Sequence, residues 1–448
     1  MKKLFGTDGI RGIANSEPIT AETAFRIGRS GAYLLKDRVN PKILIGRDTR
    51  ISGDMLESAL IAGICSLGVN VLRAGVLPTP AVAYLNRIYN VDYGIVISAS
   101  HNPFDNNGIK YIRKNGFKFS DTEEEALEKI YFENLFKNNL PTGRNIGCVE
   151  NIYDAKDRYI QHIKSTIPSH FNLKGKKIVI DCANGALYQI APQVFHDLGA
   201  DVISINDKPN GININLECGA TNTSSLQKEV LINKAELGLA YDGDADRLIA
   251  VDEQANVVDG DQIMAICALN LIKKNQLKHN LVVTTLMSNM GFDKAIEAAG
   301  GVVIRTQIGD RYVFEKMKET DAILGGEQSG HLIFLNHGTT GDGLLSSLQL
   351  LKVMIEEEKT LSNLASVVEK FPQTLLNFKI TDKNCFFDNN NIKKMIKSCK
   401  EKLNGNGRVF VRASGTEPLI RVLLEGKDKH TLENISINLK EVVEKENL

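Results

Sequence analysis

The 448-residue sequence contains 54 lysine and arginine residues and 54 aspartate and glutamate residues, so its formal net charge is zero. This balance argues against a chain-wide attraction to nucleic acid or to an anionic membrane surface, and we expect neither partner. Apolar residues make up 43% of the chain and charged residues 24%, which is an ordinary globular composition. At about 100–200 residues per domain, the length predicts about three or four domains.

Targeting and redox signals favour a cytoplasmic protein. The lysines at the start of the chain are not followed by the apolar segment of a signal peptide, and apolar runs such as 263–272 are too short to span a bilayer. The seven cysteines are scattered, without any C-x-x-C pair. This pattern favours reduced thiols over a disulfide framework.

Short apolar runs alternate with segments of helical spacing along most of the chain. The first such pair is a strand-like run at 42–46 and a helix-like segment at 54–67. Further strand-like runs lie at 69–73, 93–98, 177–181, 201–205, 237–241, 281–285 and 302–306. This alternation predicts stacked α/β units with largely parallel sheets. The tail after residue 371 differs, because a helix-like run precedes two strands at 408–412 and 420–425, and it predicts a smaller α+β domain.

A loop of small and polar residues, 98–103 (SASHNP), follows one of these strands. Serine is a weak nucleophile unless a neighbour activates it or it already carries the group to be transferred. Asn-Pro alone is also a common turn signal. The loop therefore indicates either a plain turn or an exposed catalytic hydroxyl.

Three carboxylates alternate with small residues directly after the strand 237–241, in the order Asp242, Asp244 and Asp246. Alternate residues of an extended segment point the same way, so these side chains can converge. Converging carboxylates repel unless a cation lies between them, and oxygen-only ligands suit Mg²⁺. A calcium hand is disfavoured because Arg247 stands where that loop needs glycine, and because the flanks are strand-like. The remaining alternative is a solvated acidic turn.

Other loops combine glycine with polar side chains. The segment 325–331 (GGEQSGH) suits hydrogen bonding to sugar hydroxyls, or forms a tight turn. The segment 412–418 (RASGTEP) carries arginine, hydroxyl and glycine groups that can wrap a phosphate, although a hairpin with surface arginines is the alternative. The segment 6–12 (GTDGIRG) is a weaker pattern of the same kind. We find no P-loop, no dinucleotide fingerprint and no zinc spacing in the sequence.

Together these loops resemble the α-D-phosphohexomutase family, whose motifs occur here in the same order between residues 6 and 425. The segments 210–220 and 309–313, and Gln328, are similar to the phosphoglucosamine branch of that family. One position departs from the family, because Ser98 stands where threonine is commoner. Two serines therefore share one loop, and Ser100 is assigned as the phosphate acceptor by resemblance.

The resemblance implies an α/β fold of four domains around a central cleft. Three related mixed α/β units would be followed by a smaller C-terminal α+β domain. We expect domain I, with the phosphoserine loop, at 1–150, and domain II, with the metal loop, at 151–253. Domain III, with the sugar-binding loop, would occupy 254–370, and domain IV, with the phosphate-binding loop, 371–448.

The resemblance also implies a role for each loop. Ser100 would carry the phosphate and, with Asp242, Asp244 and Asp246, hold one Mg²⁺ per subunit. Arg247 would steady the phosphoserine, and Arg11, Lys110 and His331 are candidates for the general base. Sugar hydroxyls would bind Glu327 and Ser329. The non-reacting phosphate would bind Arg412, Ser414, Gly415, Thr416 and Arg421.

The implied reaction converts glucosamine 6-phosphate to glucosamine 1-phosphate through a hexose 1,6-bisphosphate, which also acts as the activator. The product would feed an amino-sugar nucleotide for the cell wall, and the branch suggests a homodimer. The alternative within the family is a phosphomannomutase or phosphoglucomutase. More distant alternatives are a serine-dependent sugar phosphatase and a non-catalytic sugar-phosphate binder.

Overall fold

The structure is a computed structural model, which describes residues 4–6, 8–137, 140–380, 383–403, 405–413 and 419–446. The chain divides into two compact units. The large unit comprises Met1–Met287 and Ala299–Val367, and the small unit comprises Ser288–Ala298 and Val368–Leu448. None of the helices in the described ranges has the length and apolar character that a bilayer crossing needs.

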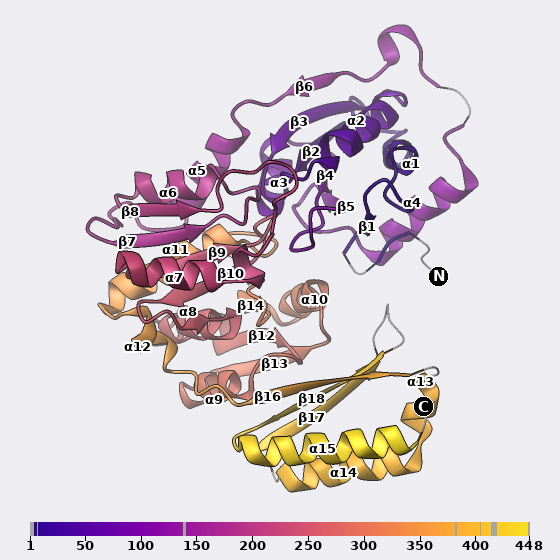
Figure 1. Cartoon of the computed structure of the whole chain (residues 1–448). Coiled ribbons are helices and arrows are strands. Elements are labelled where there is room, and N and C mark those ends of the chain that lie inside the picture. Colours follow the sequence, from indigo (N-terminus) through magenta and orange to yellow (C-terminus); the bar gives the residue numbers. More distant parts are fainter. Residues whose placement is uncertain are drawn as a thin grey trace. The chain divides into compact units, whose positions relative to one another are not determined.

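The first α/β region is built on a six-stranded sheet with the order β1-β5-β4-β2-β3-β6 (Figure 1). Its strands are β1 (Ile10–Ile13), β2 (Lys42–Arg47), β3 (Asn70–Val76), β4 (Tyr93–Ile97), β5 (Asn106–Arg113) and β6 (Val149–Asn151). Its helices are α1 (Ala21–Tyr33), α2 (Ser52–Cys65), α3 (Thr79–Ile88) and α4 (Asp121–Glu133). Strands rich in isoleucine are buried because helices cover the sheet, as expected for a mainly parallel core.

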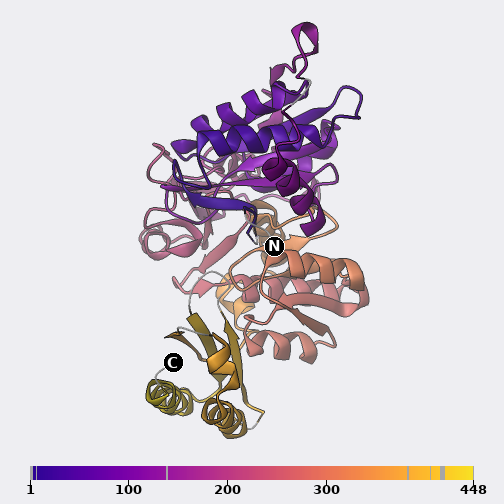
Figure 2. The same ribbon diagram turned by 90° about the vertical axis from the view of Figure 1, so that its right-hand side faces the viewer.

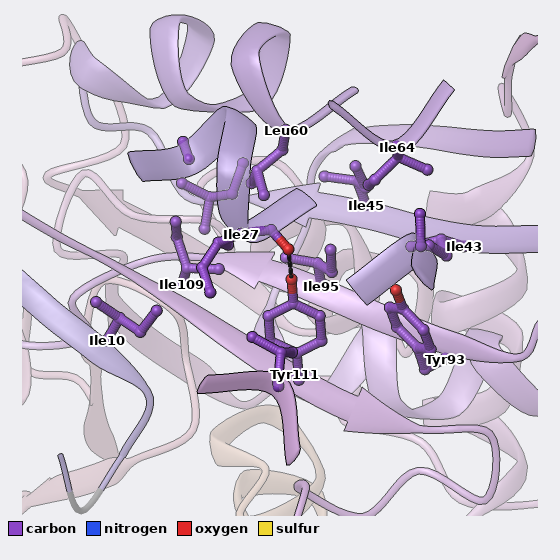
Figure 3. Close-up of a cluster of buried hydrophobic side chains, with 14 of the residues drawn as sticks. Ile10, Ile27, Ile43, Ile45, Leu60, Ile64, Tyr93, Ile95, Ile109 and Tyr111 are labelled. Carbon is purple, nitrogen blue, oxygen red and sulfur yellow. Dashed lines mark hydrogen bonds between the residues drawn. The ribbon is translucent and has the colours of Figure 1, made fainter. Parts of the chain in front are cut away.

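Figure 3 shows the centre of this core, where isoleucines of the sheet pack with Leu60 and Ile64 of α2. Tyr111 enters the same cluster, and its hydroxyl donates a hydrogen bond to the Ile27 carbonyl at 2.9 Å. The polar end of this buried aromatic side chain is thereby satisfied.

The second region is built on a five-stranded sheet with the order β11-β10-β9-β7-β8. Its strands are β7 (Lys177–Asp181), β8 (Asp201–Ile205), β9 (Leu237–Tyr241), β10 (Leu248–Asp252) and β11 (Val257–Val258). Its helices are α5 (Ala155–Ser165), α6 (Ile190–Asp197) and α7 (Ser224–Asn233).

The third region is built on a four-stranded sheet with the order β13-β12-β14-β15. Its strands are β12 (Leu281–Thr285), β13 (Val302–Thr306), β14 (Leu324–Gly326) and β15 (Leu332–Phe334). Its helices are α8 (Gly260–Lys273), α10 (Asp310–Thr320), α11 (Gly343–Glu357) and α12 (Leu361–Ala365).

The three sheets share one arrangement of four strands. In each, two parallel strands are followed by an antiparallel hairpin at one edge, in the orders β3-β2-β4-β5, β8-β7-β9-β10 and β13-β12-β14-β15. The hairpin loops are 98–105, 242–247 and 327–331, which are the serine, aspartate and sugar loops of the sequence. The antiparallel edge refines the expectation of largely parallel sheets, and the repetition places one polar loop at the same point of each region.

The small unit is an α+β structure with an antiparallel sheet of order β16-β18-β17. Its strands are β16 (Gln373–Lys379), β17 (Gly407–Ala413) and β18 (Leu419–Gly426), and its helices are α9 (Met290–Ala298), α13 (Lys383–Asp388), α14 (Asn390–Leu403) and α15 (Lys429–Lys445). Helices α14 and α15 lie on the same face of the sheet (Figure 2).

The segment Ser288–Ala298 is joined to the small unit by buried hydrogen bonds. Asn289 exchanges hydrogen bonds with the backbone of Phe371, and the Met290 amide donates to Glu425 Oε1 at 2.7 Å. Arg408 binds the carboxylate of Glu425 and donates to the Ser288 carbonyl at 2.6 Å.

The predicted fold class is confirmed, because three related α/β regions precede a smaller α+β region. The four domain boundaries remain a prediction.

Candidate active site

The serine loop and the aspartate loop meet in the large unit. Ser100 Oγ donates a hydrogen bond to Asp242 Oδ2 at 2.5 Å, although the two residues are 142 positions apart. Both side chains are buried. The antiparallel hairpins of two different sheets thus bring a hydroxyl against a carboxylate cluster.

The two serines of the first loop have different environments. Ser98 Oγ donates to Asp48 Oδ2 at 2.6 Å and accepts the Ser100 amide at 2.9 Å, so it is engaged on both sides. Ser100 Oγ instead points to the aspartate loop. Of the two serines, Ser100 is therefore the one whose hydroxyl contacts the aspartate loop, which the sequence pattern alone did not reveal.

Asp242, Asp244 and Asp246 converge as the alternating pattern predicts. One carboxylate oxygen from each lies within 4.8 Å of the others, and all three side chains are buried. Asp244 Oδ1 and Asp246 Oδ1 have no hydrogen-bond partner among the described residues. Burial, followed by the charges of Asp246 and Asp244, raises the pKa of Asp242 well above its ordinary value. These residues could hold a metal ion, since a cation would satisfy the orphaned oxygens and relieve the repulsion.

Lys110 reaches the same cluster from β5. Its Nζ lies 2.9 Å from Asp244 Oδ2 and 3.1 Å from Asp8 Oδ2. Burial acts to lower the pKa of Lys110, but Asp244 and Asp8 outweigh it and raise this pKa. Thr79 Oγ1 also donates to Asp244 Oδ2, at 2.6 Å. One oxygen of Asp244 is thus held by the protein while the other is left for a ligand.

Two arginines border the cluster. The Arg247 amide donates to Asp242 Oδ1 at 3.2 Å, and its Nε lies 3.8 Å from Asp246 Oδ1. Arg11 donates to the Ala99 carbonyl at 3.4 Å and is paired with Asp8. Arg247 therefore lies at the aspartate loop, and Arg11 lies beside the serine loop.

His331 ends the sugar hairpin and faces the third aspartate. Its Nδ1 lies 3.5 Å from Asp246 Oδ2, and the Gly341 amide donates to its Nε2 at 3.1 Å. Burial lowers the pKa of His331, but Asp246 and Asp310 outweigh this effect and raise it. In the neutral form, the Gly341 contact places the ring proton on Nδ1, where it points to Asp246.

Further charged side chains, Lys118 and Asp310, lie next to these groups, and the sequence did not predict them. Lys118 is paired with both Asp8 and Asp310, and a cavity of about 180 Å³ is lined in part by Lys118, Asp310 and His331. The available signal was a lysine between two phenylalanines, Phe117 and Phe119. Such a position indicates a charged side chain within an apolar layer, where it needs carboxylate partners.

The sugar loop is anchored on the aspartate hairpin. Gly330 has φ +91°, and a Cβ there would lie 2.1 Å from the Leu248 carbonyl oxygen, so only glycine fits. Glu327 accepts the Gly309 amide at 3.1 Å and the Ser329 hydroxyl at 3.2 Å. The two predicted sugar ligands are therefore adjacent and partly exposed.

The predicted phosphate loop lies in the small unit. Arg412 and Arg421 are directly opposite each other on the antiparallel strands β17 and β18. Burial and the charge of Arg421 lower the pKa of Arg412. Ser414, Gly415 and Thr416 fall outside the described residues.

Family models match consecutive parts of the chain, and each is described as phosphoglucomutase/phosphomannomutase. They cover alpha/beta/alpha domain I at residues 2–138, domain II at 157–256, domain III at 259–371 and the C-terminal domain at 375–441. The chain belongs to the phosphoglucomutase/phosphomannomutase family. The predicted membership of the α-D-phosphohexomutases is therefore confirmed, and it makes this family member an isomerase of the intramolecular phosphotransferase type that acts on phosphosugars.

Relatives with curated names are similar to this phosphohexomutase over nearly its whole length. "Phosphoglucosamine mutase" of Geobacter sp. (strain M21) is 51% identical over 445 residues, which is 99% of this chain and 98% of the relative. The protein of the same name from Citrifermentans bemidjiense is 53% identical over 430 residues, covering 96% and 95% of the two chains. A crystal structure of a phosphoglucomutase/phosphomannomutase family protein from Burkholderia thailandensis has the same fold, with a TM-score of 0.80, 23% identity, and coverage of 98% and 96%.

Proposed function

We propose that the protein is a phosphoglucosamine mutase that interconverts glucosamine 6-phosphate and glucosamine 1-phosphate. A phosphorylated Ser100 and a hexose 1,6-bisphosphate intermediate would carry the transfer, and the bisphosphate would serve as activator. The observation that carries the proposal is the 2.5 Å contact between Ser100 Oγ and the buried aspartate cluster. The names of the relatives at 51% and 53% identity support the sugar.

The oxygen-only ligand set of Asp242, Asp244, Asp246 and Ser100 fits one Mg²⁺ per subunit, which would offset negative charge on the transferring phosphate. The protein's own cations do related work. Lys110 and Arg247 lie within 4 Å of carboxylates of the cluster and are positioned to attract phosphate oxygens. Their fixed positions need no rearrangement as charge develops.

The three candidates for the general base differ in their contacts. Lys110 and Arg11 both have a raised pKa, because nearby carboxylates outweigh their burial, so both stay protonated at neutral pH. Protonated groups fit charge stabilisation better than proton removal. The pKa of His331 is also raised, by Asp246 and Asp310, but imidazole is the one group of the three whose ordinary pKa lies near neutral pH. We therefore propose that His331 exchanges the proton of the sugar hydroxyl. A pH–rate profile that is unchanged in His331→Gln would exclude this role.

On the substrate side, Glu327 and Ser329 would bind the sugar hydroxyls. Arg412, Ser414, Gly415, Thr416 and Arg421 would bind the phosphate that does not react. Two arginines that lie opposite each other on neighbouring strands can both donate to one phosphate, which supports this assignment.

The decisive experiment is intact-protein mass spectrometry on wild type, Ser100→Ala and Ser98→Thr, with a coupled assay for glucosamine 1-phosphate. We expect one phosphate on wild type and on Ser98→Thr, and neither phosphate nor activity in Ser100→Ala. Full activity in Ser100→Ala would reject the phosphoserine mechanism, because no other hydroxyl of the loop faces the aspartates.

The same assay separates the alternatives. Faster turnover of mannose or glucose phosphate would make the protein a phosphomannomutase or phosphoglucomutase. Release of free phosphate without need of a bisphosphate activator would make it a sugar phosphatase. Binding without turnover would make it a non-catalytic binder.

We also propose a cytoplasmic homodimer that contributes to amino-sugar nucleotide synthesis for the cell wall, with no nucleic-acid or membrane partner. Light scattering of the purified protein tests the dimer, which a monomer mass at micromolar concentration would reject.

A further inference from the structure

The backbone of the serine loop converges on one buried arginine. The Arg50 guanidinium donates to the carbonyl oxygens of Ser100 at 2.9 Å and Asn102 at 2.8 Å. It also donates to the carbonyl of Asn106 at 3.0 Å and to that of Pro103. The Arg50 side chain is fully buried, so these contacts are made without competition from water.

A second path links Arg50 to the other side of the Ser100 peptide. Asp48 Oδ2 accepts both Arg50 Nε at 2.9 Å and Ser98 Oγ at 2.6 Å. Ser98 Oγ in turn accepts the Ser100 amide at 2.9 Å. The hydrogen bonds close a ring, in which the amide and the carbonyl of Ser100 are both fixed by the Asp48–Arg50 pair.

The second α/β region reinforces the ring. Asn215 Nδ2 donates to the carbonyl oxygens of Ser100 at 2.8 Å and Asn102 at 3.1 Å. Asn215 is itself held by its backbone N–H, which donates to the Ala183 carbonyl at 2.9 Å. The segment 210–220, which is similar to the phosphoglucosamine branch of the family, thus holds the serine loop by hydrogen bonds.

Ser100 needs such support because its backbone has φ +53°, a conformation that residues other than glycine rarely adopt. Conformations of this kind persist only where surrounding contacts determine them. Without the contacts, the serine loop would relax and Ser100 Oγ would leave its position against Asp242.

We propose that Arg50, Asp48, Ser98 and Asn215 form a serine clamp, a set of positioning residues that holds Ser100 Oγ against the aspartate loop. The proposal rests on the function proposed above, in which Ser100 carries the phosphate. None of the four touches the reacting atoms. The clamp therefore acts on the rate of phosphate transfer and leaves binding of the sugar phosphate unchanged.

The test compares Asn215→Ala with a matched control, Asn86→Ala. The side-chain amide of Asn86 also donates to two backbone carbonyls, those of Ile112 at 3.1 Å and Arg113 at 3.2 Å, but it does not contact the serine loop. Both variants lose the same kind of interaction. We expect similar shifts in melting temperature, with kcat reduced about tenfold or more only in Asn215→Ala and KM unchanged in both.

A second pair tests the ring. Ser98→Ala removes the hydroxyl that joins Asp48 to the Ser100 amide, whereas Ser98→Thr keeps it. We expect Ser98→Ala to slow phosphate transfer from glucose 1,6-bisphosphate to Ser100, followed by mass spectrometry in a single turnover, and Ser98→Thr to restore the wild-type rate. Equal transfer rates in Asn215→Ala, Ser98→Ala and Asn86→Ala at matched folded fractions would overturn the clamp.

The transfer assay also separates this result from the fate of the proposed function. It needs no glucosamine phosphate, so a different preferred sugar would leave the comparison between variants intact. If wild-type Ser100 takes up no phosphate at all, the phosphoserine mechanism fails and the clamp fails with it.

Discussion

Two regions of the molecule gather charges of one sign, and they do so in different ways. In the large unit, three aspartates converge in a fully buried cluster. In the small unit, Arg412 and Arg421 face each other across two strands and stay partly exposed. Like charges at short range are unfavourable in both places, and a ligand of opposite sign would relieve both. Such a cost is what we expect at the binding sites proposed above for a cation and for an anion.

The two regions differ in how the protein prepares them. Thr79 and Lys110 hold Asp244, and the Arg247 amide and Ser100 hold Asp242, so the aspartates are fixed before a cation binds. Arg412 and Arg421 are only partly buried, so water also weakens their mutual repulsion. We therefore expect the aspartate cluster to affect catalysis and stability strongly, and the arginine pair to affect mainly binding.

The largest expected effect follows from Asp242→Asn. The amide keeps the shape, and the Ser100 hydroxyl can accept from it instead of donating. Activity should fall at least about 100-fold because the cation site loses a charge. The metal-free variant should nevertheless be more stable than metal-free wild type by about 1–3 kcal/mol, because Asp242 no longer places a buried negative charge beside Asp244 and Asp246. Denaturant titration in EDTA measures this gain.

Asp252→Asn is the matched control. Asp252 is also buried, but its carboxylate accepts from the amides of Gln254 and Asn256 and from the Asn256 side chain. Its replacement should lower stability. If Asp242→Asn also lowers metal-free stability, the aspartate cluster is not strained by repulsion, and the comparison with the arginine pair fails.

The stability of the metal-free protein should also depend on pH through Asp242. The pKa of Asp242 in the folded chain lies well above its value in the unfolded chain, about 3.9. The unfolded chain therefore loses this proton first, and metal-free wild type should lose stability as the pH rises above about 4. Asp242→Asn should remove this part of the loss.

An intermediate effect is expected from Arg412→Gln. The KM for the sugar phosphate should rise about 10–100-fold, which corresponds to the loss of one hydrogen-bonded ion pair, while kcat changes less. Stability should stay equal or increase slightly, because Arg421 loses a like-charged neighbour. Steady-state kinetics and thermal melting measure both.

Arg408→Gln provides the contrast on the same strand. Arg408 binds the buried carboxylate of Glu425, so its loss should destabilise the small unit and leave KM unchanged. A rise in KM that is equal in the two variants would show that Arg412 has no special part in phosphate binding.

The smallest expected effect comes from His162, whose burial disfavours the protonated imidazole. His162 stacks on Tyr84 with ring centroids 3.9 Å apart, and burial followed by the charges of Arg87 and His337 lowers the pKa of His162 to about 4. Because the unfolded histidine takes up a proton at about pH 6.5, stability should fall as the pH drops from about 6.5 to 4. Partial exposure of the ring limits this loss to about 1 kcal/mol.

His162→Phe keeps the stacked ring and should remove that loss, whereas His170→Gln, at an exposed position, should retain it. Melting curves at pH 4.5 and 7 compare the variants. An unchanged acid sensitivity in His162→Phe would place its origin elsewhere in the chain.

The sequence predicted the chemistry of the loops better than their contacts. Alternating aspartates after an apolar strand have few physical explanations besides a cation site, and the structure brings their carboxylates together. The choice between Ser98 and Ser100 could not be made in this way. It depends on Asp48, which lies 50 residues from Ser98 and is brought close only by the parallel pairing of β2 and β4.

Contacts between distant parts of the chain also explain why the sequence did not predict the Lys118–Asp310 pair. Lys118 lies beside Asp310 although they are 192 positions apart, and a local pattern carries no trace of such a pair. Nor does it reveal that Ser288–Ala298 belongs to the small unit, because α9 has the ordinary position of a helix between the parallel strands β12 and β13. Spacing predicts which face of an element is buried, and the tertiary fold decides against which partner.

Helix α9 is synthesised well before the rest of the small unit to which it belongs. The Met290 amide donates to Glu425, which lies much later in the chain. Since synthesis runs from the N-terminus, α9 leaves the ribosome before Glu425 has been added. At about 5–20 residues per second, the 135 residues between them give a delay of roughly 7–27 seconds. During that time the Met290 amide lacks the partner that Glu425 supplies in the finished protein. A fragment that begins at residue 371 would lack Ser288 and Met290, and with them the hydrogen bonds that join this segment to Arg408 and Glu425.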